Sequence, residues 1–324
     1  MSHKIAVISF DHWNYDVHIV NALQEKGIES FHIKIGDFKY KNKWERIKNS
    51  LSKIFLGKNP KLKKRQEYII QQLKENGFQN QILVINPELI DLEYHLEIKK
   101  YTDKYIAYLY DSVSRCPVKH LLDGVFDEIF SFDKKDVLTY GFSETTNYIY
   151  FDAPEKASIQ KQNLIYIGSI DNRLKFLNDF GEHLKKQQRS FLFYAIGKKA
   201  YLNQLKQLFL GKNKNIIFQK KRFSQQQTLK MYAESEIIID LVRDNQSGLS
   251  FRIFEALGLQ KKVITNNISV QNYDFYLPNN VCLINEKGQF DTNVYTAKYE
   301  RLPQNIYDKY YISEWVKTVF NLKI

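Results

Sequence analysis

The sequence predicts an α/β fold made of two Rossmann-like, doubly wound domains that face a central cleft. Short apolar runs alternate with segments of helical periodicity, a pattern typical of a parallel sheet covered by helices. The alternation starts twice along the chain, and 324 residues are enough for two domains that each have a core. Hydrophobic residues make up 44% of the chain, which excludes a disordered protein.

The first series of elements occupies the N-terminal half. In such sheets, ligands bind beyond the carboxyl ends of the strands. The loops at residues 11–16 and 111–115 follow two of the predicted strands and are therefore the expected ligand-binding loops. The predicted strands are residues 5–10, 31–35, 82–85, 105–110 and 126–132.

The pattern restarts after a polar segment that contains a proline, residues 152–162, which we expect to connect the domains. The predicted N-terminal domain is therefore residues 1–151, and the C-terminal domain is residues 163–305. We expect residues 306–324 to form a helix that packs back on the N-terminal domain. The predicted strands of the second series are residues 164–168, 191–194, 216–218, 237–241 and 263–265.

The loop after the predicted strand at 237–241 is suited to bind phosphate. Gly248 allows a tight loop there. Ser247 and Ser250, with the backbone N–H groups of the helix that follows, can donate hydrogen bonds to phosphate oxygens. An ordinary amphipathic helix between two strands is the alternative interpretation.

The helix after this loop carries two charged residues that suit a nucleotide. Arg252 and Glu255 are three positions apart and lie on one helical face. An arginine there can bind a diphosphate, and a carboxylate can accept hydrogen bonds from both ribose hydroxyls. The segment therefore predicts a site for a nucleotide-sugar.

The same segment resembles the donor-site signature of the group 1 glycosyltransferases, which have the two-domain GT-B fold. The family pattern has two glutamates, which would fall at positions 247 and 255 here, followed by Ala, Gly and a Val-Ile-type strand. Glu255, Ala256 and residues 263–264 match its second half, and Gly258 lies slightly early. In the family, the first glutamate helps to hold the donor sugar. This chain has Ser247 at that position.

The resemblance implies a metal-independent glycosyltransferase that moves a sugar from a nucleotide-diphosphate donor to a glycan or lipid-linked acceptor. It also implies a role in lipopolysaccharide, capsule or related surface-polysaccharide synthesis. A sugar-nucleotide epimerase of the same fold is one alternative. A non-catalytic binding protein on a degenerate transferase scaffold is another, and Ser247 favours it.

Other polar residues follow the predicted strands of the second domain. They are candidates for donor binding because loops at strand ends can approach a phosphate, and because cations neutralise a diphosphate. For the lysines the alternative is a solvated basic loop, and for the arginine at 243 it is an ion pair with Asp244. The candidates are Gly168, Ser169, Arg173, Lys220, Lys221 and Arg243.

On the acceptor side, the candidate proton-handling residues are Asp11, His12 and Asp111, with Asp16 beside them. A base must lie within hydrogen-bond reach of the acceptor hydroxyl. A capping role in a loop is the alternative for each residue. A reaction that retains the configuration of the sugar would not strictly require a side-chain base.

We expect neither a metal nor another cofactor. The sequence has no Asp-x-Asp motif, and basic residues with helix N-termini can offset the charge of a diphosphate leaving group. Cys116 and Cys282 are far apart in sequence and lack metal-ligand spacing, so they are expected to be reduced thiols of a cytoplasmic protein.

The net charge of +12 is concentrated in two segments. Residues 39–65 contain 11 basic residues and one acid, with apolar residues such as Trp44 and Phe55 at helical spacing, which predicts contact with an anionic membrane surface. A solvated surface helix is the alternative. Residues 183–233 contain 12 basic residues and no acid.

No nucleic-acid-binding motif accompanies the charge, so no nucleic-acid partner is expected. No signal peptide or membrane-spanning run is seen.

Overall fold

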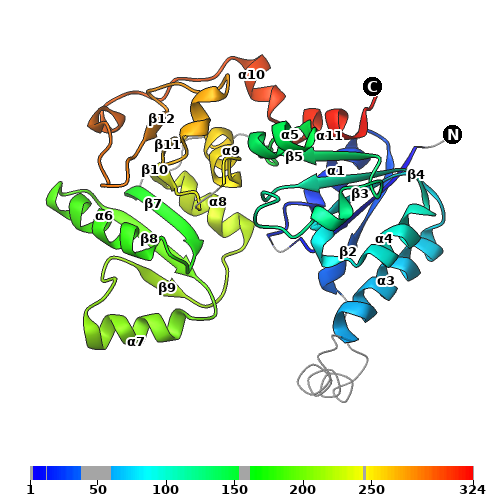
Figure 1. Cartoon of the computed structure of the whole chain (residues 1–324). Helices are drawn as coiled ribbons and strands as arrows, with labels where there is room; N and C mark the ends of the chain where they lie inside the picture. Colours follow the sequence, from blue (N-terminus) through cyan, green and yellow to red (C-terminus); the bar gives the residue numbers. More distant parts are fainter. Residues whose placement is uncertain (1–2, 12, 38–59, 153–160, 244–245, 324) are drawn as a thin grey trace. The chain divides into compact units, whose positions relative to one another are not determined.

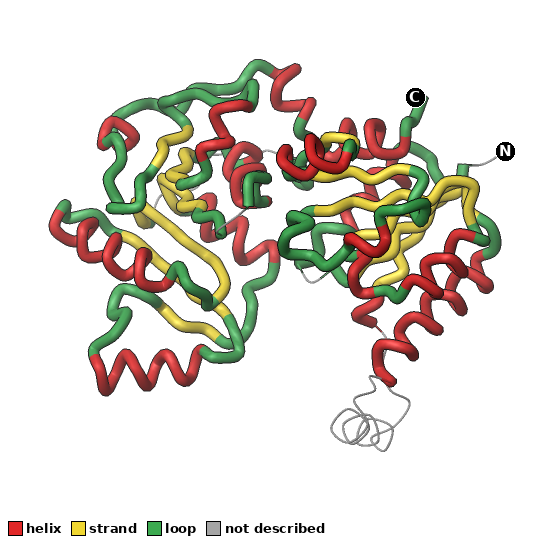
Figure 2. Tube along the Cα trace, in the orientation of Figure 1, coloured by secondary structure: helices red, strands yellow, loops and turns green. Residues whose placement is uncertain are grey.

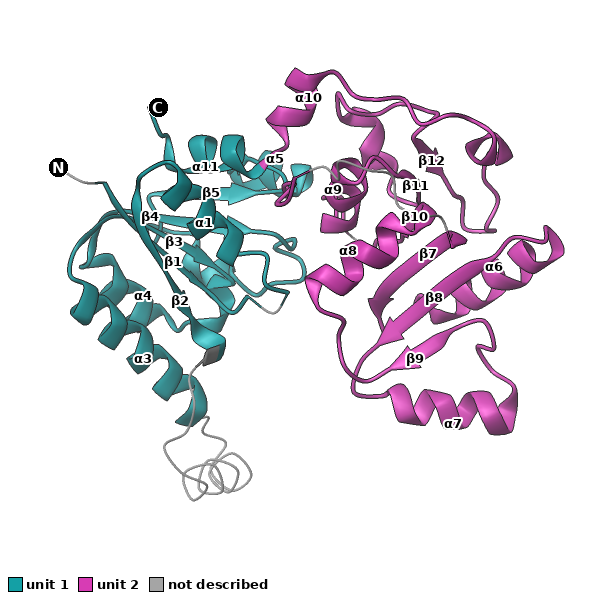
Figure 3. Cartoon of the chain, turned by 180° about the vertical axis from the view of Figure 1, so that it is seen from behind, with its two compact units in different colours: residues 1–146, 312–324 teal, residues 147–311 magenta. Residues whose placement is uncertain are grey.

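The computed structural model describes the chain except for residues 1–2, 12, 38–59, 153–160, 244–245 and 324 (Figure 1). It contains two parallel sheets, each with helices beside it (Figure 2). The chain divides into two compact units (Figure 3). Unit 1 comprises Met1–Thr146 with Ile312–Ile324, and unit 2 comprises Asn147–Tyr311.

Unit 1 is built on a six-stranded sheet of order β2-β1-β3-β4-β5-β6, in which all pairs are parallel. The strands are β1 Lys4–Ser9, β2 Glu29–Lys34, β3 Gln79–Ile85, β4 Thr102–Leu109, β5 Glu128–Ser131 and β6 Ser143–Glu144. The helices are α1 Val17–Glu25, α3 Pro60–Asn76, α4 Leu92–Lys99, α5 Lys134–Tyr140 and α11 Ile312–Phe320.

Both faces of the central strands of unit 1 are covered. Alternate residues of β1 point to opposite faces, so Ala6 and Ile8 share a core with Ile69 and Leu73 of α3. On the other face, α1 packs against α11. The Trp315 Nε1 of α11 donates a hydrogen bond of 2.8 Å to the backbone oxygen of Thr146, which ties this C-terminal helix to unit 1.

Unit 2 repeats the architecture with a parallel sheet of order β12-β11-β10-β7-β8-β9. The strands are β7 Gln162–Ser169, β8 Phe191–Ile196, β9 Ile217–Gln219, β10 Ser235–Asp240, β11 Lys262–Thr265 and β12 Val281–Leu283. The helices are α6 Leu174–Lys186, α7 Ala200–Leu210, α8 Gln225–Ala233, α9 Phe251–Gly258 and α10 Gln304–Lys309. The predicted fold class, two Rossmann-like units with parallel sheets, is confirmed.

The core of unit 2 also has two sides. Leu164 and Tyr166 of β7 pack with Phe180 of α6, whereas the alternate residues Ile165 and Ile167 pack on the side of α8 and α9. Such a strand is a nearly continuous apolar run, since a parallel strand is buried on both faces.

The units begin and end at positions that differ from the predicted domain limits. Residues 147–151 belong to unit 2, where the side-chain amide of Asn147 donates to the backbone oxygen of Leu249 and the Ile149 N–H donates to the backbone oxygen of Tyr310. Helix α10 belongs to unit 2 as well. Most of the predicted linker, residues 153–160, lies outside the described residues, as does most of the basic segment 39–65.

In each sheet the strand order reverses once. The reversal lies between β1 and β3 in unit 1, and between β7 and β10 in unit 2. Loops at such a point diverge to opposite faces of the sheet and leave a crevice at the carboxyl ends of the strands, where ligands of doubly wound sheets bind. The topology therefore places the expected ligand site of each unit at the carboxyl ends of the strands, beside the reversal point.

Gly258, the last residue of α9, has no room for a side chain. A Cβ there would lie 2.8 Å from the Phe151 ring and 2.9 Å from Ile149. Gly258→Ala should therefore lower the free energy of unfolding by about 1–3 kcal/mol, although alanine is ordinarily the better helix former. Urea denaturation measures this. Gly197→Ala is the matched control, because its Cβ would meet Ile170 at ordinary distances from 3.6 Å. Equal stability of the two variants would contradict the packing argument.

Candidate functional site

The carboxyl end of β10 is organised around the buried carboxylate of Asp240. Its Oδ1 accepts hydrogen bonds from the Ser250 hydroxyl at 2.7 Å and from the Arg252 guanidinium at 2.5 Å, and its Oδ2 accepts from Thr265 at 3.2 Å. Asp240 is fully buried, so these partners are what satisfies the charge. The start of α9 is thereby fixed against β10 and β11.

Arg252 is held at the reversal point of the sheet. Its Nε donates to the backbone oxygen of Ile167 in β7, while its Nη1 binds Asp240 of β10. Burial lowers the pKa of Arg252, but the charge and hydrogen bond of Asp240, together with the nearby Tyr166 and Tyr232, outweigh burial and raise that pKa. Arg252 is therefore a permanent cation between β7 and β10.

Glu255 lies one helical turn further along α9 and is buried. Its Oε1 accepts a hydrogen bond of 2.7 Å from the Tyr150 hydroxyl. Tyr150 was not among the site residues predicted from the sequence, since it lies 105 positions before Glu255. Any ribose bound to Glu255 would share this carboxylate with Tyr150.

The loops after β7 and β10 bring two arginines around one carboxylate. Asp171 accepts from the Arg173 Nε at 2.9 Å and from the Arg243 Nε at 3.1 Å. Burial raises the pKa of Asp171, but the hydrogen bonds and charge of Arg173, together with the hydrogen bond from Arg243, outweigh burial, so that pKa is lowered. Arg173 also donates to the backbone oxygen of Leu241 and links the β7 and β10 loops. Asp244, the partner considered for Arg243, lies outside the described residues.

Gly168 is required for a reason that the sequence did not show. A Cβ at this position would lie 2.2 Å from the Tyr166 hydroxyl, so the glycine makes room for that ring. The guanidinium carbons of Arg173 and Arg252 lie 5.8 and 5.4 Å from the centroid of the same ring. Ser169 is the last residue of β7 and stands at the same edge.

The serine-glycine loop is fixed by an asparagine. The Asn267 Nδ2 lies 3.2 Å from the backbone oxygens of both Ser247 and Gly248. Ser250 is the N-cap residue of α9, but its hydroxyl binds Asp240 rather than a backbone N–H of the helix. The first turn of α9 therefore receives no side-chain cap from Ser250, and its N–H groups remain suited to an anion.

The structure does not bring every candidate to this edge. Lys220 and Lys221 follow β9, and β7 and β8 separate β9 from β10 in the sheet. At a strand spacing of about 4.8 Å, that places the ends of β9 and β10 roughly 14 Å apart. Of the predicted donor-site residues, the sheet gathers those that follow β7 and β10. They are Gly168, Ser169, Arg173, Arg243, Ser247, Gly248, Ser250, Arg252 and Glu255.

The corresponding edge of unit 1 is rich in carboxylates. Asp11 follows β1 in a left-handed backbone conformation with φ 43°, and its Oδ1 accepts from the backbone N–H of Asp16 at 3.1 Å. Both side chains are buried, and Lys34 lies 3.6 Å from Asp11. Burial, and then the charge of Asp11, raise the pKa of Asp16 to about 7. His12 lies outside the described residues.

Asp111 stands at the same edge of unit 1. It forms an ion pair with Arg115 at 2.7 Å. The hydroxyl of neighbouring Tyr110 donates to Asn86, which follows β3. Burial raises the pKa of Tyr110, and the charges of Asp16, Glu88 and Asp111 raise it further. The loops after β1, β3 and β4 therefore gather acidic side chains around Tyr110. One of them, Glu88, was not among the residues predicted from the sequence.

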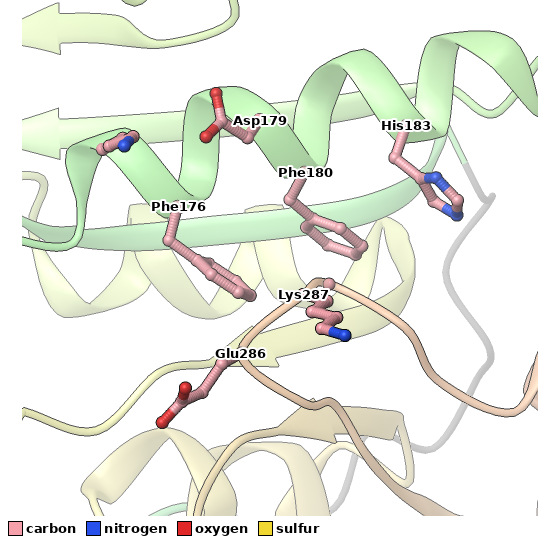
Figure 4. Close-up of a pocket in the computed structure, with 8 residues that line it drawn as sticks. Phe176, Asp179, Phe180, His183, Glu286 and Lys287 are labelled. Carbon is pink, nitrogen blue, oxygen red and sulfur yellow. The ribbon is translucent and has the colours of Figure 1, made fainter.

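Metal-binding clusters and cavities among the described residues were compared with the predicted site. No group of three His, Cys, Asp or Glu residues among them has a geometry that could hold a metal ion. A cavity of about 390 Å³ lies between α6 and the loop after β12, with Phe176 and Phe180 facing Glu286 and Lys287 (Figure 4). None of the predicted site residues lines this cavity.

Solved structures share the fold of the whole chain. The UDP-forming α,α-trehalose-phosphate synthase from Burkholderia xenovorans has a TM-score of 0.65 at 13% identity, over 99% of this chain and 98% of that one. An α-glucosyltransferase in complex with UDP and a 13-mer DNA has a TM-score of 0.62 at 12% identity, over 98% and 96%. The apo form of the lipopolysaccharide outer core galactosyltransferase WaaB has a TM-score of 0.54 at 14% identity, over 98% and 99%.

The fold is the GT-B fold. Each of these structures matches both Rossmann-like units, since each alignment covers nearly all of the chain. No protein-family model matches the sequence, and no curated protein matches it. The described part of the chain contains no helix with the length and apolar character needed to cross a membrane.

The buried pair Asp11 and Asp16 makes stability depend on pH. The pKa of Asp16 is about 7 in the folded state against an ordinary 3.8, so the folded state retains a proton that the unfolded state loses. The stability that Asp16 contributes at low pH is therefore lost as the pH rises through 7. Asp16→Asn should gain stability relative to the original chain by on the order of a few kcal/mol between about pH 4 and 8.

Urea denaturation at a series of pH values measures this difference. Asp103→Asn is the matched control, because Asp103 is exposed. A stability difference for Asp16→Asn that does not change with pH would show that Asp16 is ionised throughout the range.

Proposed function

We propose that this protein is a glycosyltransferase that moves a sugar from a nucleoside-diphosphate donor to a hydroxyl group of a glycan or glycolipid. The observation that carries the proposal is the convergence of three arginines and the N-terminus of α9 at the reversal point of the unit 2 sheet. Arg173, Arg243 and Arg252 meet two carboxylates there, Asp171 and Asp240, which leaves a net charge of +1 among these five side chains.

This edge suits the chemistry of a diphosphate leaving group. As the acceptor oxygen bonds to the anomeric carbon, the bond from that carbon to the diphosphate breaks and negative charge develops on the leaving oxygen. Arginines already fixed by Asp171 and Asp240 can stabilise that charge without reorganising, and the N–H groups of α9 add to the effect. The reaction proposed here needs no metal ion.

Arg243 is the arginine best placed to bind the diphosphate. Its Nε donates to Asp171, while its side chain is 36% exposed, more than those of Arg173 and Arg252 at 11% and 16%. Among the described residues no hydrogen bond engages its two terminal nitrogens, so a bidentate contact to phosphate oxygens is available. Arg173 and Arg252 position the loops around it.

Unit 1 would supply the acceptor side of the reaction. Asp11 and Asp111 are the proposed proton acceptors, and Asp16 shares the buried site of Asp11. The finer assignment to lipopolysaccharide or capsule synthesis is also a proposal. It is supported by the similarity of fold to WaaB, a lipopolysaccharide outer core galactosyltransferase.

A panel of UDP-, GDP- and CMP-sugars tests the reaction class. We expect a UDP- or GDP-sugar to release its nucleoside diphosphate, and to do so faster when an acceptor glycan is added. A CMP-sugar, which can release only a nucleoside monophosphate, should not react. Conversion of the bound sugar to an epimer without release of nucleotide would identify an epimerase instead. Binding of a nucleotide with neither reaction would identify a binding protein on a transferase scaffold.

Arg243→Ala should weaken the binding of the nucleoside diphosphate by about 1.5–3 kcal/mol, because a hydrogen bond between charged groups is lost. The affinity for the nucleoside alone should stay the same, since it lacks the phosphates. Isothermal titration calorimetry with both ligands measures the two affinities. Lys220→Ala at the distant β9 edge is the control. A larger loss for Lys220→Ala would move the diphosphate site to β9.

Glu255→Gln should weaken nucleoside and nucleoside diphosphate alike, by about 1–3 kcal/mol, if Glu255 binds the ribose hydroxyls. A 2′-deoxynucleotide should be less sensitive to the change. Tyr150→Phe is the matched control, because it removes only the hydroxyl that shares the carboxylate. Unchanged ribonucleotide affinity in Glu255→Gln would restrict Glu255 to its structural contact with Tyr150.

A further inference from the structure

Helix α7 packs on its sheet through polar side chains. The Gln204 Nε2 donates to the backbone oxygen of Phe218 in β9 at 3.0 Å, and the Gln207 Nε2 lies 2.7 and 3.0 Å from the backbone oxygens of Asn213 and Ile216. Ala200 is the one residue of α7 that is buried. The amide side chains therefore hold the helix against this part of the chain. Strand β9 is the edge strand of the unit 2 sheet, and α7 lies beside it (Figure 1).

The apolar side chains of α7 lie on its outer surface. Tyr201 and Leu208 are 67% and 76% exposed, and Leu202 and Phe209 are 57% and 76% exposed. The two residues of each pair are seven positions apart, which is about two helical turns, so both pairs lie along one side of the helix. Five of the thirteen exposed large hydrophobic residues in the described chain lie on α7 when Leu210 is included. Such a cluster marks an interaction surface rather than scattered surface residues.

Positive charge surrounds this apolar side. Lys206 lies within α7, Lys198 and Lys199 directly precede it, and Lys212 and Lys214 follow it. All five are exposed, and none forms an ion pair with another described residue. The whole stretch 183–233 contains 12 basic residues and no acid, so no acidic side chain within it offsets the charge.

We propose that α7 docks the protein on an anionic lipid surface. The apolar side chains Tyr201, Leu202, Leu208 and Phe209 enter the boundary between headgroups and acyl chains, and the flanking lysines bind the lipid phosphates. A nucleic acid would attract the lysines but would leave the apolar side exposed to water. A second copy in a two-fold dimer would bring like charges together. The inference does not depend on the proposed transfer reaction.

Sedimentation of the full chain with vesicles at low salt tests the proposal. We expect binding to vesicles that contain phosphatidylglycerol and little binding to pure phosphatidylcholine. Leu208→Gln with Phe209→Gln should lower the affinity for anionic vesicles by about tenfold or more, since two apolar groups no longer enter the interface. Replacing Lys206, Lys212 and Lys214 by Gln should lower it by about a hundredfold, at about 1 kcal/mol per lysine.

Two matched controls replace exposed apolar residues elsewhere. Leu138 of α5 is 87% exposed, and Ile268 is 69% exposed, so Leu138→Gln and Ile268→Gln should bind vesicles like the original chain. Thermal unfolding checks that each variant is folded. The single variants Leu208→Gln and Phe209→Gln provide the same test where the double variant is unstable. Nucleotide affinity should not change in any of them.

Four results would overturn the proposal. The first is a lack of binding to anionic vesicles. The second is binding of the double variant that equals that of the original chain, which would assign the contact to another segment such as residues 39–65. The third is a loss as large in Leu138→Gln as in the α7 variants. The fourth is unchanged vesicle binding together with loss of self-association or of DNA binding, which would make α7 a surface for that partner instead.

Discussion

The arrangement of unit 2 depends on one buried carboxylate, that of Asp240. A charge at the end of a central strand is unfavourable unless hydrogen bonds satisfy it, and here Ser250, Arg252 and Thr265 do so. These partners come from the loop before α9, from its first turn and from β11. The requirement to satisfy one charge therefore fixes the N-terminus of α9, and with it Glu255, at the reversal point of the sheet.

The two units show how one topology can present two chemistries. Both have a parallel sheet whose strand order reverses once, so both have a crevice at the carboxyl ends of the strands. In unit 2 the loops at this edge bring Arg173, Arg243 and Arg252 together, which favours an anion. In unit 1 they bring Asp11 and Asp16 together in a buried setting, which favours the protonated form of Asp16.

Helix α7 differs from helices α6 and α9 of unit 2 in the side chains that attach it to the sheet. Helices α6 and α9 bury leucine and phenylalanine side chains, whereas α7 is held by Gln204 and Gln207 and exposes its apolar residues. The arrangement contributes little hydrophobic stabilisation to the fold. It is consistent with a surface that is completed by a partner, and the lysines around it indicate an anionic one.

The sequence by itself determined the alternation of strands and helices, the parallel sheets, and the segment that carries Ser250, Arg252 and Glu255, because burial on two faces and helical spacing are local patterns. Only the tertiary structure decided which distant residues these side chains contact. Tyr150 and Glu255 are 105 residues apart in sequence, and Arg252 and Ile167 are 85 apart. Likewise, Gly168 is required by the ring of Tyr166, and the side of α7 that faces outward is set by amide contacts to β9. A periodic pattern records which residues share a face, but hydrogen bonds and steric limits between distant segments exist only once the chain has folded.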